Sequence, residues 1–372
     1  MQARRFRSLG AHTRPSAVSV VTVLAVVAVF VVALLPSPYA VEQPGPVYDT
    51  LGSSGTGKDR APLISIPGKQ TYPTTGRLDL LTVSVLGNAS GGPSWFDLAE
   101  AWLDPDEAVI PLEAVFPQGE TQQQAEQQSA QQMTASQRSA ITAALTRLGY
   151  TVDGTVTIGS VQRGSAAAGS LQRGDVVTTF AGRPIDDACS LQNAVAANGT
   201  AQAAVVIERG GKRETLRIAP RETDDGAGGT RPLLGVTTSA TMRYPFDVDL
   251  RIDDVGGPSA GMMFALGIID KLTPGSLTGG RHVAGTGTIC GDGRVGAIGG
   301  IVQKLSAARA AGATLFLAPA ANCDEVVGHI PSGLDVVAVD TLSDSLEALE
   351  QVRETGSARG LPTCSARVSS AG

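Results

Sequence analysis

Apolar and polar positions divide the chain into an apolar segment near its start and a longer part of mixed pattern. Residues 17–35 carry no charge, and at a helical rise of about 1.5 Å per residue they nearly cross a hydrocarbon layer of about 30 Å. This predicts one transmembrane helix after a cytoplasmic tail of residues 1–16. A cleaved signal peptide is the alternative, but its apolar region is about 7–15 residues and ends in small residues, whereas Pro36 and Pro38 follow here.

Arginines precede this apolar segment and acidic residues follow it, so the positive-inside bias places the remainder of the chain outside the cytoplasm. Residues 36–150 are predicted to form a linker and a mixed outer segment. The linker is expected at residues 41–60, which are rich in Gly, Pro and Ser. Alternating and helical spacing then predict two strands and two helices, at residues 63–66, 80–86, 95–103 and 121–148. The Gln-rich face over residues 122–137 is expected to be solvated.

Residues 151–222 combine short strand patterns with one helix, which predicts a small β-rich domain. The expected elements are strands at 156–161, 203–208 and 214–219 and a helix at 191–197. The segment resembles the PDZ domains of bacterial HtrA-type and site-2 proteases at Gly164, Ala166, Leu171, Gly174, Asp175, Val176, Gly182 and Leu191. The resemblance implies binding of peptide ends by strand addition to a sheet edge. A plain spacer or docking role is the alternative.

A Gly-Pro-Ser turn precedes the apolar helical run of residues 262–272. Proline suits the first position of a helix and glycine suits a tight turn, so Gly257 and Pro258 are expected to open this helix. Ser259 then lies at a helix N-terminus, where free amides and the helix dipole can stabilise a developing oxyanion. This position suits a nucleophile.

A second motif, Gly299-Gly300 followed by Lys304, begins an Ala-rich helix. A lysine is a weak base at its ordinary pKa of about 10.4, but desolvation lowers that pKa and allows the neutral amine to accept a proton from a serine. Alone, Ser259 could be a helix cap and Lys304 a solvated residue. Their combination favours catalysis.

These two motifs resemble those of the Lon proteolytic domain, and the resemblance covers residues 233–346. It implies an α/β (α+β) Lon-type protease domain with a Ser259–Lys304 dyad, supported by Thr286, which orients the lysine, and by Gly257, Pro258 and Ala260 of the nucleophile motif. Gly256 departs from the family, because many Lon proteins have an acidic residue there. An anchor and a PDZ domain before this domain are similar to PDZ-containing Lon-like proteases of Gram-positive bacteria, especially actinobacteria. That similarity implies an ATP-independent serine endopeptidase on polypeptide substrates, and it allows homo-oligomers.

Composition and net charge limit the kinds of binding partner that the protein is expected to have. The 372 residues are 42% hydrophobic and 17% charged with a net charge of −6, which is typical of a globular α/β protein of two or three domains and argues against nucleic-acid binding. Three histidines and four cysteines form no close-spaced cluster, so neither a metal nor a cofactor is predicted. Outside the membrane disulfides are permitted, and we expect a Cys323–Cys364 bridge that holds the C-terminal tail, residues 347–372.

Three other interpretations have weaker support. Residues 52–59 nearly match a phosphate-binding loop, but Asp59 replaces the hydroxyl residue and prolines follow; residues 291–296 match a dinucleotide motif, but a β-hairpin turn is favoured. A Ser-His-Asp triad would need His282 or His329, and neither has supporting spacing. The competing function is an inactive membrane-tethered PDZ scaffold. The predicted location is the cell membrane, single-pass, with the catalytic part outside.

Overall fold

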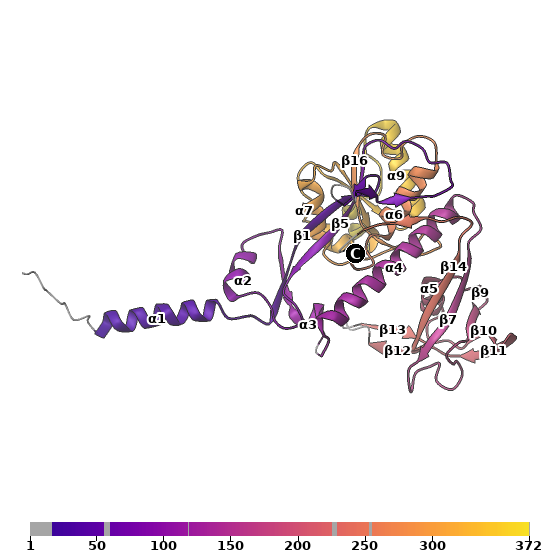
Figure 1. Ribbon diagram of the computed structural model, residues 1–372, viewed down its shortest axis with the longest axis horizontal. Coiled ribbons are helices and arrows are strands. Elements are labelled where there is room, and N and C mark those ends of the chain that lie inside the picture. Colours follow the sequence, from indigo (N-terminus) through magenta and orange to yellow (C-terminus); the bar gives the residue numbers. More distant parts are fainter. Residues whose placement is uncertain (1–16, 56–59, 118, 225–228, 253–254, 372) are drawn as a thin grey trace, which may run out of the picture. The chain divides into compact units, whose positions relative to one another are not determined.

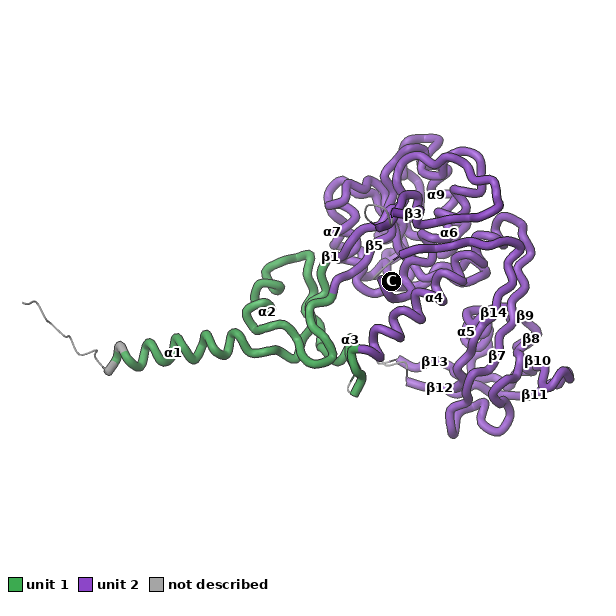
Figure 2. The backbone as a smooth tube through the Cα atoms, viewed as in Figure 1, with its two compact units in different colours: residues 1–43, 85–122 green, residues 44–84, 123–372 purple. Residues whose placement is uncertain are grey.

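The computed structural model describes residues 17–55, 60–117, 119–224, 229–252 and 255–371. The predicted cytoplasmic tail and half of the phosphate-loop-like segment lie outside the described residues. The chain divides into two compact units, residues 1–43 with 85–122 and residues 44–84 with 123–372 (Figure 2).

The first unit is small, and helices are its main regular elements. It contains α1 (Ala17–Ala33), α2 (Trp95–Ala101), β6 (Ala108–Pro111) and α3 (Leu112–Val115), together with the start of β1 (Tyr39–Asp49). Helix α2 begins where predicted because Ser94 and Asp97 form a capping box, in which each side chain accepts from the other residue's backbone amide. Its core is Val41, Leu98 and Ala101.

Helix α1 covers residues 17–33 of the predicted span, and its large side chains are exposed. Within the described residues, no helix combines the length and the apolar character that crossing a membrane requires. The transmembrane segment of residues 17–35 therefore stays a prediction.

The second unit is built on a sheet whose strands follow the order β20–β19–β16–β5–β1. These strands are β20 (Asp335–Val339), β19 (Leu315–Pro319), β16 (His282–Gly285), β5 (Arg77–Leu86) and β1. The pairs from β5 through β20 are parallel. The interpretation of residues 41–60 as a linker is wrong for their first half, because β1 occupies residues up to Asp49; Gly45 allows the close approach, since a Cβ there would lie 2.5 Å from Thr82 Oγ1.

Alternate residues of the sheet face two helical layers, which makes this part an α/β sandwich (Figure 1). Leu315 and Leu317 pack with α6 (Gly261–Leu272), α9 (Leu342–Thr355) and the end of α4 (Gln122–Arg147). Phe316 and Ala318 pack on the other face with α7 (Ile301–Ala310), α8 (Cys323–Val326) and α10 (Cys364–Ala371). The predicted Cys323–Cys364 disulfide is confirmed, and it joins α8 to α10.

The PDZ-like segment forms a second sheet in the order β11–β10–β8–β7–β14, with β9 beside β8. Its elements are β7 (Asp153–Val161), β8 (Val176–Phe180), β9 (Arg183–Pro184), α5 (Ala188–Asn198), β10 (Ala203–Arg209), β11 (Lys212–Ile218) and β14 (Val236–Arg243). The predicted strands and helix are confirmed, and Val156, Phe180 and Leu191 are in their core. Strand β14, from beyond the predicted limit of this domain at residue 222, pairs antiparallel with β7 along its whole length.

Four short antiparallel pairs complete the described strands. They are β2 (Ser53–Ser54) with β3 (Ala61–Pro62), β4 (Ile64–Ser65) with β15 (Asp249–Leu250), β12 (Arg221–Asp224) with β13 (Thr230–Leu233), and β17 (Thr288–Ile289) with β18 (Val295–Gly296). The last pair is the hairpin predicted at residues 291–296, which is therefore not a dinucleotide motif placed between a strand and a helix.

Candidate active site

The nucleophile loop, residues 255–260, lies immediately before α6. Gly257 has φ of 84°, a left-handed conformation that favours glycine. Helix α6 begins at Gly261 with Ala260 as its N-cap, so the expectation that Pro258 opens the helix is wrong, and Ser259 lies in the turn before it. The helix amide of Met262 donates to the Gly287 carbonyl, so that amide is engaged within the fold.

Lys304 reaches this loop from the second turn of α7. Its Nζ donates a hydrogen bond to Ser259 Oγ at 3.0 Å, and the residue is only 3% exposed. Helix α7 starts after Gly300, which has φ of 65°, and the Lys304 amide donates to the Gly300 carbonyl. Burial of Ile301, Leu305 and Ala308 fixes this helix against the sheet, and thereby fixes the direction in which Lys304 extends.

Thr286 joins the serine to the lysine. Its Oγ1 accepts from Lys304 Nζ at 3.3 Å and donates to the Ser259 carbonyl at 3.1 Å. The amide of Gly287 also donates to the Ser259 carbonyl, at 2.9 Å. The connection after β16 therefore holds the nucleophile loop from one side, and Thr286 lies where the predicted lysine-orienting residue should lie.

Helix α4 contacts the loop from another side, which the sequence interpretation missed. The Ser129 carbonyl accepts from the Gly257 amide at 3.0 Å, and Ser136 Oγ donates to the Pro258 carbonyl at 2.8 Å. The expected solvated face of residues 122–137 is therefore only part of the helix surface. The signal was present: Ser129, Met133 and Ser136 follow the spacing of one helix face, continued by the buried Ala140.

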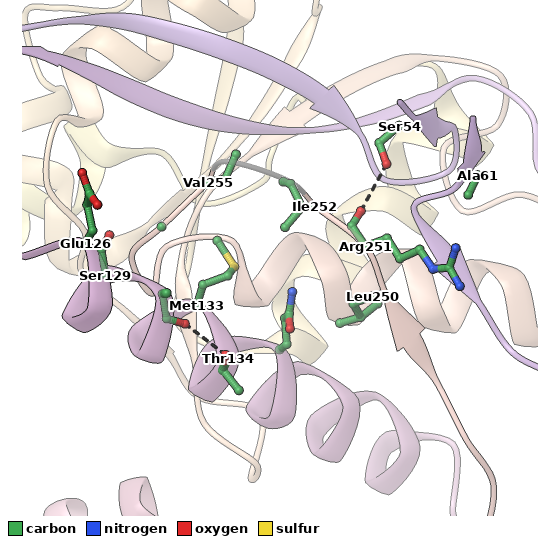
Figure 3. A pocket seen from close by; sticks show the side chains of 13 residues that line it. Ser54, Ala61, Glu126, Ser129, Met133, Thr134, Leu250, Arg251, Ile252 and Val255 are labelled. Atoms are coloured by element: carbon green, nitrogen blue, oxygen red, sulfur yellow. Dashed lines mark hydrogen bonds between the residues drawn. The ribbon is translucent and has the colours of Figure 1, made fainter. Parts of the chain in front are cut away.

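An open cavity of about 950 Å³ adjoins this loop (Figure 3). One wall is α4, through Glu126, Ser129 and Met133, and the opposite wall is formed by residues 250–252, 255 and 256. Ser54 and Ala61 of the β2–β3 hairpin lie at its end, and Ser54 Oγ donates to the Arg251 carbonyl. The cavity is large enough for an extended segment of several residues.

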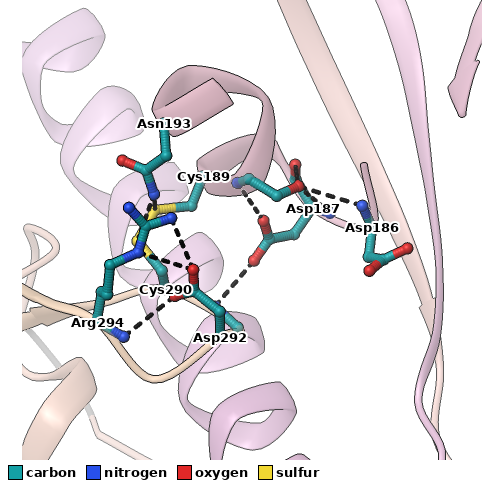
Figure 4. Close-up of polar contacts among 9 residues, drawn as sticks. Asp186, Asp187, Cys189, Asn193, Cys290, Asp292 and Arg294 are labelled. Atoms are coloured by element: carbon teal, nitrogen blue, oxygen red, sulfur yellow. Dashed lines mark hydrogen bonds and ion pairs between the residues drawn. A yellow bond between two sulfur atoms is a disulfide. The ribbon is translucent and has the colours of Figure 1, made fainter. Parts of the chain in front are cut away.

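A second disulfide, Cys189–Cys290, joins α5 of the PDZ-like segment to the β17–β18 hairpin (Figure 4). Beside it, Asp187 caps α5 through Oδ1 and accepts the Gly291 amide through Oδ2 at 2.9 Å. Burial, with a smaller contribution from Asp187, raises the pKa of Asp186. The hairpin also contains an Arg294–Asp292 ion pair.

The two candidate histidines have other partners. His282 Nε2 pairs with the buried Asp79 of β5, which also accepts from Arg77. His329 Nδ1 lies 3.0 Å from the Glu325 carbonyl. Ser259 Oγ instead has Lys304 beside it, so the geometry provides a Ser–Lys pair rather than a Ser–His pair.

Residues 254–351 match the family model of the Lon protease (S16) C-terminal proteolytic domain. This confirms the Lon resemblance for the segment that holds Ser259, Thr286 and Lys304, and it places that segment in the class of serine peptidase domains. Similar proteins include the Lon protease of Clostridioides difficile, 39% identical over 24% of this chain and 12% of that protein, and Lon protease 2 of Bacillus subtilis, 32% identical over 33% of this chain and 22% of that protein. The chain thus spans less than a quarter of the length of these curated relatives.

Solved structures that are similar to part of this chain include PDZ domains. The PDZ domain of an SdrC-like protein from Listeria monocytogenes is 21% identical, with a TM-score of 0.20, over 22% of this chain and 85% of that chain. Its counterpart from Listeria innocua is 24% identical, with a TM-score of 0.21, over 23% and 92%. At these values the PDZ interpretation rests on the strand order and core of the segment itself.

Proposed function

We propose that this protein is a serine endopeptidase in which Ser259 is the nucleophile and Lys304 is its general base. The observation that carries the proposal is the 3.0 Å contact between Lys304 Nζ and Ser259 Oγ, made by a lysine that is almost fully buried. Burial disfavours the charged ammonium, and the neutral amine is the form that accepts a proton.

The reaction follows from these positions. Neutral Lys304 takes the hydroxyl proton as Ser259 Oγ adds to the peptide carbonyl, and the ammonium then gives that proton to the leaving amine. Water enters next, gives a proton to Lys304 and adds to the acyl carbonyl, and the Ser259 ester bond breaks with return of that proton to Ser259 Oγ. Thr286 holds Lys304 in line through its Oγ1 during both steps.

Activity on polypeptides is tested with the full chain, a labelled unfolded casein and a fluorophosphonate probe, without added nucleotide. We expect casein cleavage and labelling at Ser259 in the wild type and loss of both in Ser259→Ala. Lys304→Arg keeps a cation but cannot supply a neutral amine, so it should also be inactive. Ser369→Ala and Lys212→Met change exposed residues of the same types and should keep wild-type rates. A wild type that neither cleaves nor labels would favour the scaffold alternative; cleavage that stops without ATP would refute independence from ATP.

The PDZ-like segment is proposed to bind the extended end of a polypeptide along β14, which is the last strand of its sheet. A cavity of about 570 Å³ runs beside this strand, between β14, the start of α5 and α4. Ala240 lines it, so Ala240→Trp should fill the cavity and weaken peptide binding, measured by fluorescence anisotropy with peptides selected from a random C-terminal library. Unchanged affinity in this variant would place the peptide elsewhere.

The site of action is proposed to be outside the cytoplasmic membrane, with residues 17–35 as the anchor. Support comes from the two disulfides, which form and persist in oxidising compartments. Protease added to intact cells with the cell wall removed should degrade the catalytic part. Full protection of that part until the cells are lysed would refute the proposed location.

A further inference from the structure

Helix α4 lies outside the segment that matches the Lon proteolytic domain, yet it contacts three consecutive residues just before the nucleophile. The contacts are the Gly257 amide to the Ser129 carbonyl, 3.0 Å, and Ser136 Oγ to the Pro258 carbonyl, 2.8 Å. Both Ser129 and Ser136 lie on one face of the helix, two turns apart. The third contact is steric and concerns Gly256.

A side chain at position 256 has no room. A Cβ there would lie 1.9 Å from Ser129 Oγ and 2.8 Å from Ser129 Cβ. Gly256 is not in the left-handed region, so its backbone conformation would admit other residues. The proximity of α4 is therefore what requires glycine here, and it accounts for the departure from the acidic residue of many Lon proteins.

The helix itself is firmly held. Ala140, Ala144 and Leu145 of its C-terminal half are buried in the core that also contains α6. The Arg138 carbonyl accepts from Tyr244 hydroxyl at 3.1 Å, which connects the helix to the chain that enters the catalytic part. A rigid helix that contacts both the core and the loop can fix where the loop places its serine.

We propose that α4 is a positioning element for the nucleophile: the Ser129 carbonyl and the Ser136 hydroxyl hold residues 256–258 so that Ser259 Oγ meets Lys304 Nζ. This inference rests on the proposed peptidase function. Ser129 and Ser136 are positioning residues, because they act through the loop and contact no reacting atom. Since a displacement of about 1 Å can lower a rate about 100-fold, loss of these contacts should be visible in the chemistry.

The test measures the rate of Ser259 labelling by a fluorophosphonate and the hydrogen exchange of the Gly257 amide in the full chain. Ser136→Ala should label about tenfold more slowly or worse. Gly256→Ala should do the same, and the added Ser129→Gly should return labelling to the rate of Ser129→Gly alone, because the nearest remaining atom is then the Ser129 backbone carbon at 3.3 Å. Gln132→Ala, an exposed residue of the same helix, serves as the control and should label at the wild-type rate.

The double variant Gly256→Ala/Ser129→Gly separates a displaced loop from a loss of folding, because a double variant whose labelling rate recovers must be folded. Wild-type labelling rates in Ser136→Ala and Gly256→Ala would overturn the inference. If the wild type itself is not labelled, the peptidase proposal fails, and exchange then decides this inference alone: Gly257 protected in the wild type and unprotected in both variants supports it, and equal protection overturns it.

Discussion

Removing the Cys189–Cys290 disulfide should lower the stability of the second unit more than removing Cys323–Cys364. The two cysteines of the first bridge are 101 residues apart, which in the chain-entropy description corresponds to about 4.7 kcal/mol as an upper value. For the second bridge the separation is 41 residues, and the same relation gives about 3.9 kcal/mol. The difference, about 0.8 kcal/mol, arises only from loop length.

The perturbations are the double variants Cys189→Ala/Cys290→Ala and Cys323→Ala/Cys364→Ala. Urea unfolding should be followed by far-ultraviolet circular dichroism, because both tryptophans, Trp95 and Trp102, lie in the first unit and would not report on the second. Both variants should unfold at lower urea than the oxidised wild type, the first by the larger amount. Free thiols at Cys189 and Cys290 in oxidised protein, or an unfolding midpoint unchanged by their removal, would refute the reasoning.

Three further changes test other parts of the molecule. Thr286→Val removes the hydroxyl between Lys304 and Ser259 with little change of shape. The lost hydrogen bond holds the ammonium that Lys304 becomes when it takes the proton, and such a bond to a charged group contributes about 1.5–3 kcal/mol, so kcat for peptide cleavage should fall about 10- to 100-fold while KM changes little. An unchanged kcat would remove Thr286 from the site. The Arg209 hydrogen bonds lower the pKa of the buried Asp175, so this carboxylate stabilises the fold above its ordinary pKa and loses that effect as pH falls through the lowered value. Arg209→Met should therefore lower the melting temperature at pH 7, and this loss should shrink steadily as the pH falls below the ordinary carboxyl pKa of about 3.9. A loss that stays the same over the whole acidic range would contradict the pairing. Burial raises the pKa of Asp270, so ionisation of this carboxyl group lowers the stability of the fold as pH rises. Asp270→Asn should therefore melt at a higher temperature than the wild type at pH 8 and lose this advantage at pH 4. The opposite trend in the melting curves would refute the assignment.

The local sequence pattern was sufficient to predict the elements that hold Ser259 and Lys304. The Gly-Pro-Ser turn and the Gly-Gly motif before Lys304 each place one residue on a helix or next to it, and the apolar runs of β16 and β19 set those helices on opposite faces of one sheet. The PDZ-like strands were also clear, because their alternation encloses one small core.

The sequence pattern did not predict the contacts between segments that are distant along the chain. The Gly- and Pro-rich residues of β1 read as a linker, since only its pairing within the sheet, and the close approach of Thr82 to Gly45, makes a strand of them. Four cysteines allow three pairings, and no local pattern selects Cys290 for Cys189. The spacing of Ser129 and Ser136 marks one face of α4, but the sequence does not show that the nucleophile loop is what this face contacts.

The position of α4 and β5 before the PDZ-like segment, and of α6 and α7 after it, makes that segment an insertion within a catalytic fold whose sequence is discontinuous. The chain enters and leaves the PDZ-like segment at neighbouring positions, since the rings of Tyr150 and Phe246 are 5.0 Å apart, edge to face. A segment whose two ends are adjacent can be exchanged for another without displacing the fold around it. The catalytic fold, in contrast, cannot be isolated by cutting the chain before residue 254, because a central strand and the helix behind the nucleophile would be left on the other fragment.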